Sequence, residues 1–238
     1  MLAAPSALRL LSTAAATTGP DEAPGWMMLR NIELAPEADR EEMLAAFETA
    51  FTPLVHETDG LQEVAVLQPH PLVWTALCVW RDRAAADAAA DAIDDSWKTV
   101  AGDNITGAAS GWDAPVDLWA TAADSAGDSG WSAIRSYRLK PDADRAALVA
   151  LTDEEFLPIV QALDGFSSFA IVRPEPDLWV AVTMWRDQPA SESSIATIRQ
   201  WVKANVMDSV IGSPDSAEGP VDLAILPDAT DMQATPDA

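Results

Sequence analysis

The sequence predicts an α+β fold in which two tandem ferredoxin-like domains, each of order βαββαβ, face each other and form one barrel. First, the chain repeats itself: residues 25–118 align without a gap on 130–223, with about 30 identities, and this period exceeds the ~20–50 residues of a solenoid unit. Second, strand-like and helix-like apolar patterns follow one another in the same order in both copies. Third, a four-stranded sheet with both helices on one face needs a cover for its other face, which a second copy supplies.

The repeat divides the 238 residues into two predicted domains, 25–121 and 130–226. Each is long enough for a small domain with its own core, and 49% of the chain is apolar. We expect a polar linker at 122–129, a disordered tail at 227–238 and a flexible segment at 1–24. Because 1–24 are rich in alanine, serine and threonine, an organelle transit peptide is the alternative for that segment.

The elements of each copy follow from apolar spacing and from proline and glycine signals. A proline ends the first strand, a shared Pro-x-Ala-Asp-Arg pattern starts the first helix, and Asp-Gly stops it. In the first copy we expect a strand at 26–34, a helix between 36–40 and 59–60, strands at 61–67 and 72–82, an alanine-rich helix at 84–98 and a strand at 115–118. In the second copy we expect the same elements at 131–139, between 141–145 and 164–165, at 166–172, 178–187, 190–203 and 220–223.

The chain is strongly acidic, with 38 Asp and Glu against 14 Lys and Arg and a net charge of −24. Such a surface repels phosphate, so we expect neither nucleic acid nor a membrane as a partner. No apolar run approaches the ~20 residues of a membrane span, and we expect a cytoplasmic protein. The charge serves either solubility or, in a halophilic setting, life at high salt, where screening removes self-repulsion. Cys78 is the single cysteine, which excludes an internal disulfide and leads us to expect a buried, inert thiol.

Tryptophans and an arginine recur at matching positions of the first and third strands of each copy. Strand alternation puts the tryptophans of the third strand on one side, and the arginine of the first strand shares a side with the tryptophan before it. If these two sides coincide between sheet and helices, each copy holds an aromatic slot with one cation in it. The residues concerned are Trp26, Arg30, Trp74, Ala76, Cys78 and Trp80 in the first copy and Trp131, Arg135, Trp179, Ala181, Thr183 and Trp185 in the second.

Such a slot suits a flat anionic or phenolic molecule, stacked on indole rings and held by charge-assisted hydrogen bonds. We therefore expect a small aromatic molecule as the partner. The predicted catalytic residues are Trp80, Trp185, Arg30 and Arg135, and the predicted binding residues are Trp74, Trp179, Trp26, Trp131 and His56. We expect no cofactor and no metal, because no ligand constellation, phosphate loop or Ser-His-Asp spacing is present in the sequence.

Three shared motifs resemble the antibiotic biosynthesis monooxygenase family. They are Phe51-x-Pro-Leu-Val, Asp59-Gly60-Leu and Trp74-x5-Trp80-Arg-Asp, with counterparts at 156–160, 164–166 and 179–187. The resemblance covers nearly all of both copies and implies an intramolecular dimeric α+β barrel, an internal pseudo-dimer that leaves further self-association open. It also implies a cofactor-independent monooxygenase in which the carbanion or phenolate of an aromatic quinol-type substrate reacts with oxygen, while the protein favours ionisation and excludes water.

The chain departs from the family pattern at several positions. Trp80 and Trp185 correspond to the tryptophan that closes the third strand, but Ala76 and Ala181 stand where anthrone oxygenases of the family have asparagine. The tyrosine that those enzymes carry six residues after the tryptophan is also missing. Neither second helix contains the histidine of the haem-degrading members, which argues against haem degradation. The alternative function is therefore a non-catalytic binding or assembly protein that keeps the fold.

Each singled-out residue also has a structural interpretation. The tryptophans pack in a core, and Arg30 and Arg135 form buried salt bridges, with Asp82 and Asp187 as the expected partners. Arg81-Asp82 forms a turn and the N-cap of the second helix, because an aspartate accepts hydrogen bonds from the first helical amides. His56 is either a surface histidine or, if the first pocket alone is active, the general base.

Overall fold

The computed structural model describes residues 25–101, 104–106, 109–122 and 129–225 of the chain. The predictions for the N-terminal segment 1–24, for most of the linker 122–129 and for the tail 227–238 lie outside these residues.

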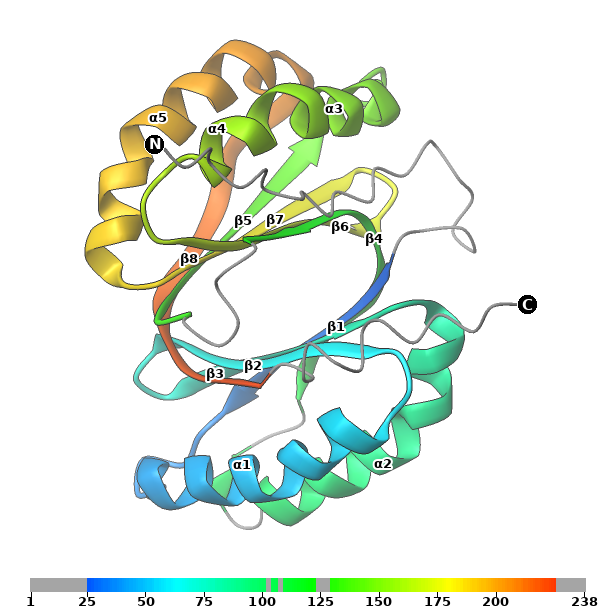
Figure 1. Ribbon diagram of the computed structural model, residues 1–238, viewed down its shortest axis with the longest axis vertical. Coiled ribbons are helices and arrows are strands. Elements are labelled where there is room, and N and C mark those ends of the chain that lie inside the picture. The colour runs from blue at the N-terminus through cyan, green and yellow to red at the C-terminus, as the bar shows by residue number, and fades with distance from the viewer. Residues whose placement is uncertain (1–24, 102–103, 107–108, 123–128, 226–238) are drawn as a thin grey trace, which may run out of the picture.

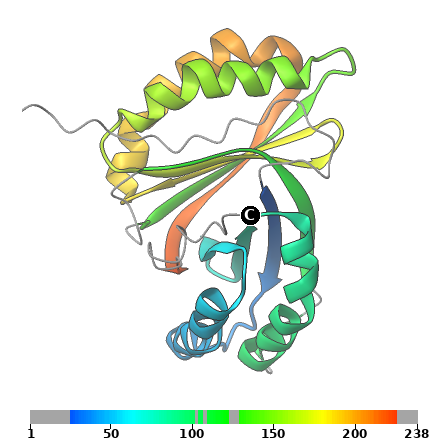
Figure 2. The same cartoon turned by 45° about the vertical axis from the view of Figure 1, so that its right-hand side comes forward.

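The predicted order βαββαβ is present in both copies. The first copy contains β1 (Gly25–Glu33), α1 (Arg40–Glu57), β2 (Leu61–His70), β3 (Val73–Trp80), α2 (Arg83–Ala101) and β4 (Ser110–Thr121). The second contains β5 (Trp131–Leu139), α3 (Arg145–Leu151), a π-helical turn (Thr152–Phe156), α4 (Leu157–Gln161), β6 (Phe166–Glu175), β7 (Leu178–Trp185), α5 (Gln188–Asn205) and β8 (Val210–Ile225). The helices lie outside, on opposite sides of the strands (Figures 1 and 2). The predicted α+β fold is confirmed.

The strands form a closed antiparallel barrel in the order β1-β3-β2-β8-β5-β7-β6-β4. Its closure depends on the last strand of each copy, which pairs with both copies. β4 pairs with β1 over 110–116 and with β6 over 116–121, and β8 pairs with β5 over 210–220 and with β2 over 221–225. Both strands are longer than the predicted 115–118 and 220–223. Their first halves are rich in Gly, Ser and Asp and show no strand periodicity, so pairing with β1 and β5 extends them.

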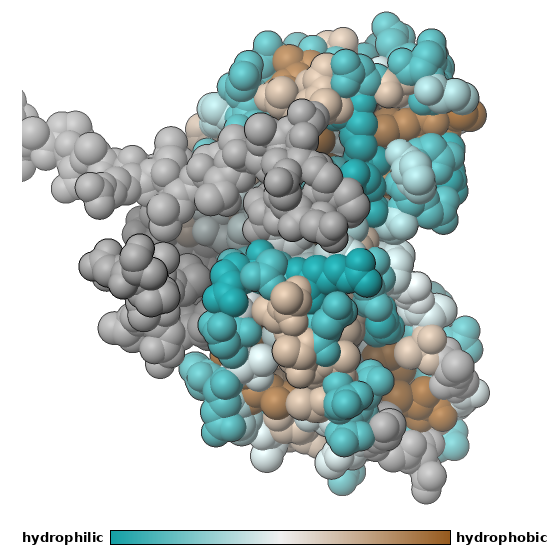
Figure 3. All heavy atoms as spheres, turned by 90° about the vertical axis from the view of Figure 1, so that its right-hand side faces the viewer, coloured by the Kyte–Doolittle hydropathy of each residue, from teal (hydrophilic) through white to brown (hydrophobic). Residues whose placement is uncertain are grey.

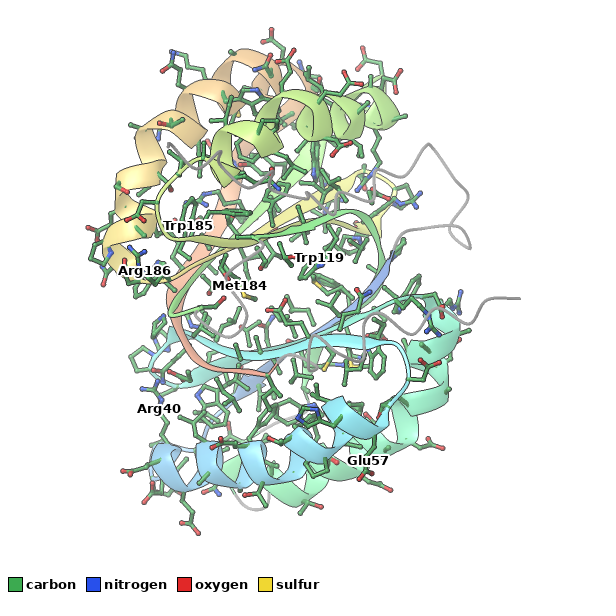
Figure 4. All side chains as sticks on the ribbon, in the orientation of Figure 1. Arg40, Glu57, Trp119, Met184, Trp185 and Arg186 are labelled. Carbon is green, nitrogen blue, oxygen red and sulfur yellow. The ribbon has the colours of Figure 1, made fainter. Side chains whose placement is uncertain are left out.

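Alternating residues of each strand belong to two kinds of core. One set fills the barrel, for example Leu77, Val79 and Met184. The other set faces the helices and includes Trp74 and Trp80 in the first copy and Trp185 in the second. Figure 4 shows the alternation at the end of β7, where Met184 points between the two sheets and Trp185 points toward the helices. The third strand therefore forms the wall between sheet and helices in each copy.

The shared Asp-Gly and Trp-Arg-Asp motifs hold each second helix in place. Arg81 donates to both carboxylate oxygens of Asp59, at 3.0 and 3.1 Å. Asp82 accepts a hydrogen bond of 2.8 Å from the amide of Ala85, so the predicted N-cap is confirmed. Arg186, Asp164 and Asp187 make the equivalent contacts in the second copy. These motifs therefore stabilise the fold and do not contribute to a site.

We predict that Gly165→Ala destabilises the protein more than Gly212→Ala, by more than ~1 kcal/mol. Both glycines have positive φ, 76° and 72°, which disfavours alanine by about 1–2 kcal/mol at either position. At Gly165 an added Cβ would also lie 2.6 Å from the Cβ of Ala190, whereas nothing lies within 4 Å at Gly212. Urea unfolding of the two variants measures the difference. Equal losses of unfolding free energy would show that the Cβ added at Gly165 does not disturb the packing of α5.

Ion pairs join each copy to the last strand of the other. Asp117 of β4 accepts from Nε of Arg145 at 2.8 Å and lies 3.2 Å from Nε of Arg173. Asp222 of β8 is paired with Arg40 at the start of α1. The two sites are related by the repeat, because the carboxylate belongs to the Pro-Val-Asp-Leu motif and the arginine to Pro-x-Ala-Asp-Arg. The motifs thus connect the two halves of the barrel.

Hydrophilic side chains cover much of the face seen in Figure 3, in keeping with the net charge of −24. Within the described part of the chain, no helix combines the length and apolar character needed to cross a membrane.

Candidate functional site

The strand register places the arginine side and the tryptophan side of each copy together. In the first copy Arg30 lies opposite Ala76, and Trp26 lies opposite Trp80. In the second copy Arg135 lies opposite Ala181. Directly opposed residues of an antiparallel pair point to the same face, here the face covered by the helices. The arginine side and the tryptophan side therefore coincide, as the predicted aromatic slot with one cation requires.

A pocket occupies this space in the second copy, between β5, β6 and β7 on one side and the helices on the other. Its lining residues are Arg135, Tyr137, Thr152, Phe156, Phe169, Ile171, Trp179, Ala181, Thr183, Ile198, Trp201, Val202 and Val206. The cavity volume is about 30 Å³, more than the roughly 10–15 Å³ that one water requires but below the ~300 Å³ of a drug-sized site. A ring-sized ligand therefore enters only when lining side chains move.

Two indole N–H groups in this pocket have no acceptor. Nε1 of Trp179 and Nε1 of Trp201 are buried without a hydrogen-bond partner among the described residues. A buried donor left unpaired costs about 1–3 kcal/mol, so a ligand oxygen that accepts from either group would gain that energy. None of the described lining residues is Asp or Glu. The pocket therefore favours a ligand that accepts hydrogen bonds.

Arg135 supplies the positive charge of the pocket. Its side chain is 21% exposed and its Nη2 is paired with Glu218 on the neighbouring β8. Arg30 is paired with Asp113 and also donates to the carbonyl of Trp112 at 3.1 Å. The expected salt bridges to Asp82 and Asp187 are thus wrong. The partners come from β4 and β8 because these strands extend further along β1 and β5 than the sequence pattern indicates.

Tyr137 is a pocket residue that the sequence analysis did not single out. It lies two residues after Arg135 on the same face of β5 and is 6% exposed. Burial raises the pKa of its phenol, and the nearby Arg135 partly offsets this. The phenol is therefore neutral at pH 7 and able to donate a hydrogen bond. The sequence did contain a signal for this residue. Tyr137 is the one tyrosine of the chain, and it stands two residues after Arg135 on the same predicted strand, so both side chains lie on the same face.

The π-helical turn Thr152–Phe156 forms the helical wall of the pocket together with α5. π-helical turns within α-helices are frequent at functional sites. Thr152 donates from Oγ1 to the carbonyl of Leu148 at 2.7 Å, and Phe156 packs on Trp201 with ring centroids 4.7 Å apart. In the first copy α1 runs from Arg40 to Glu57 without such a turn. Sequence reasoning missed Thr152 and Trp201 because a helical apolar pattern does not reveal a π turn.

The other predicted site residues lie in the core or on the surface. Trp80 and Trp185 are almost fully buried, and neither lines the pocket of the second copy. Trp26 and Trp131 are half-buried, with the guanidinium of Arg83 5.2 Å from the Trp26 ring. His56 is exposed at the end of α1, which agrees with the surface interpretation.

Cys78 is the buried thiol that the sequence predicted. Its side chain is 2% exposed in the helix-facing core of the first copy. Burial raises the pKa of this thiol to about 12, so it stays protonated and unreactive at neutral pH.

Comparison with known proteins gives matches at the level of structure. The sequence matches no protein-family model. It also matches no curated protein. A candidate monooxygenase from Lactobacillus acidophilus NCFM is similar in structure, with a TM-score of 0.70 and 17% identity over 85% of this chain and 96% of that one. A second, from Fusobacterium nucleatum subsp. nucleatum ATCC 25586, gives 0.68 and 14% over 86% and 95%.

A third similar structure is an uncharacterised ferredoxin-fold protein related to antibiotic biosynthesis monooxygenases, from Listeria monocytogenes 4b F2365. It has a TM-score of 0.51 and 7% identity over 84% of this chain and 96% of that one. At these identities the likeness concerns the fold. The resemblance read from the three sequence motifs is confirmed at that level: this chain carries, as two copies in one polypeptide, the ferredoxin-fold barrel of the antibiotic biosynthesis monooxygenase-like proteins.

Proposed function

We propose that the second copy binds a flat aromatic molecule with a phenolic or carbonyl oxygen and oxygenates it without a cofactor. The observation that carries the proposal is the pair of unpartnered indole N–H groups of Trp179 and Trp201, in an aromatic pocket that also contains the guanidinium of Arg135. Aromatic walls suit a ring system by stacking. The donors suit an oxygen that carries negative charge, because charge-assisted hydrogen bonds are the strongest.

The reaction would begin with ionisation of the bound molecule. The described lining residues include no carboxylate or imidazole, so the proton leaves to solvent, and suitable substrates ionise near neutral pH. Arg135 and the indole donors stabilise the enolate or phenolate, which transfers electrons to O2. At an activated CH2 group, one oxygen atom becomes the new carbonyl oxygen and the other leaves as water with the two hydrogens. The apolar walls keep water away from the reacting carbon.

The test uses Arg135→Met and oxygen uptake with a panel of anthrones and quinols. Removal of one donor to an oxyanion lowers kcat by about 10²-fold or more, and we expect a loss of that order. Arg138→Met is the matched control: Arg138 lies on the same strand but is paired with Glu175 and Asp177 at the surface, and its variant should keep wild-type rates. Absence of uptake by the wild type, or equal rates for both variants, would contradict the oxygenase proposal.

The second candidate function is a binding protein without catalysis. Two observations favour it. The described lining residues include no general base, and Ala181 on β7 has no polar group that could take part in catalysis. The same experiment separates the two functions. A binding protein takes up 1,8-dihydroxyanthraquinone, loses affinity on Arg135→Met, and consumes no oxygen with the corresponding anthrone.

A further inference from the structure

The two copies differ at the polar positions of the pocket. Three hydroxyl-bearing lining residues of the second copy, Tyr137, Thr152 and Thr183, align with Ile32, Phe47 and Cys78 in the first. These three counterparts are 2%, 0% and 2% exposed, so each is part of a dry core. The first copy therefore retains the strand wall but presents apolar groups where the second presents hydroxyls.

Phe47 fills the space that Thr152 leaves open in the second copy. Its ring stacks on Phe51 with centroids 4.0 Å apart and an interplanar angle of 5°. Trp97 of α2 packs on the same pair, with centroid distances of 5.0 Å to Phe47 and 5.3 Å to Phe51. Three rings in mutual contact thus occupy the region between α1 and α2. A ligand placed there would have to displace a fully buried phenylalanine, and the loss of its hydrophobic burial opposes this.

The arginines of the two copies also differ in how many groups they contact. Arg30 donates to both oxygens of Asp113 and to two backbone carbonyls, through Nη1 and Nη2. The contacts of Arg135 with described residues involve Nη2 alone, to Glu218. Among the described residues, two buried indole N–H groups lack a partner in each copy: those of Trp74 and Trp80 in the first, and those of Trp179 and Trp201 in the second, where both residues line the pocket. In the first copy the arginine is bound to Asp113 and to backbone carbonyls, and the rings of Phe47, Phe51 and Trp97 occupy the region between α1 and α2.

We infer that the described part of the chain has one ligand site, the pocket of the second copy, and that the first copy has become a closed scaffold. The ligand class rests on the proposed function: a flat aromatic molecule with an acceptor oxygen. Because the first copy supplies β4 along β6 and the second supplies β8 along β2, the closed copy still contributes to the barrel that supports the open one. One molecule of ligand per chain follows.

The experiment is calorimetric titration of the whole chain with 1,8-dihydroxyanthraquinone. The wild type should bind one equivalent. Thr152→Phe, which gives the second copy the residue of the first, should abolish binding, whereas Glu155→Phe, which adds the same ring at an exposed position of the same turn, should still bind one equivalent. Two equivalents for the wild type, or unchanged binding by a folded Thr152→Phe, would overturn the inference while leaving the proposed ligand class intact. No binding by the wild type would overturn both.

A second measurement needs no folded Thr152→Phe variant. In wild-type protein labelled with ¹⁵N, the indole N–H signals of Trp179 and Trp201 should shift on addition of 1,8-dihydroxyanthraquinone, with those of Trp74 and Trp97 unchanged. Shifts at Trp74 and Trp97 equal to those at Trp179 would show two sites and overturn the inference.

Discussion

Asp117→Asn is expected to lower the free energy of unfolding by about 3 kcal/mol. Asp117 is 13% exposed and contacts Arg145 and Arg173, which are 16% and 26% exposed. Breaking a buried ion pair by removing one partner typically costs 3–5 kcal/mol, because the remaining charge stays buried and uncompensated. The lower end applies because Arg145 also donates to backbone carbonyls, including that of Leu178 at 3.1 Å. Guanidinium chloride unfolding at pH 7 measures the change.

The chain contains its own control for this prediction. Asp222 holds the equivalent place in the second copy, but Arg40, which is 42% exposed, is its one cationic partner among the described residues. Oδ2 of Asp222 is buried without a hydrogen-bond partner in the described part of the chain, and burial raises the pKa of this carboxyl despite Arg40. The Asp222 side chain is itself only 6% exposed, so the cost of burying its carboxylate offsets much of the attraction to the half-exposed Arg40, and Asp222→Asn should cost less than about 1 kcal/mol. Equal losses for the two variants would show that burial of the arginines does not determine the effect.

Glu63→Gln is expected to stabilise the protein above neutral pH and to change its pH dependence. Glu63 lies opposite Val79 on the barrel-facing side of β2 and is 3% exposed. Burial raises the pKa of this carboxyl from 4.5 to about 7. A pKa raised in the folded state means that stability is complete below pH 4.5 and is lost as the pH rises through 7. At 1.36 kcal/mol per unit, the ionised carboxylate costs about 3 kcal/mol at pH 8.

The measurement compares unfolding free energies of wild type and Glu63→Gln at several values between pH 4 and pH 8. The difference should grow by about 3 kcal/mol in favour of the variant over this range. Glu33→Gln, at an exposed position at the end of β1, should follow the wild type throughout. A constant difference across the range would mean that Glu63 does not gain a proton on folding. The second copy avoids this cost, because Ser168 stands at the equivalent position.

Much of the fold could be read from the sequence because the signals were local or repeated. Prolines and Asp-Gly pairs bound the elements, and helical or alternating spacing identified each one. The alternation of Trp74, Ala76 and Trp80 predicted which side of β3 the helices cover, and the register with β1 bore this out. The duplication was decisive, since each weak signal occurred twice and the bare face of one sheet required the other copy.

The site was harder to predict from the sequence than the fold, for a physical reason. The partners of Arg30 and Arg135 come from strands that pair across the repeat, and a register between distant strands leaves no local pattern in the chain. The π-helical turn at Thr152 and the position of Trp201 depend on how a helix packs on the sheet. Sequence alone therefore predicted a slot of tryptophan and arginine at matching positions of both copies. Only the tertiary structure decided that they differ, because the packed rings of Phe47, Phe51 and Trp97 fill the first, whereas Thr152 leaves the second open.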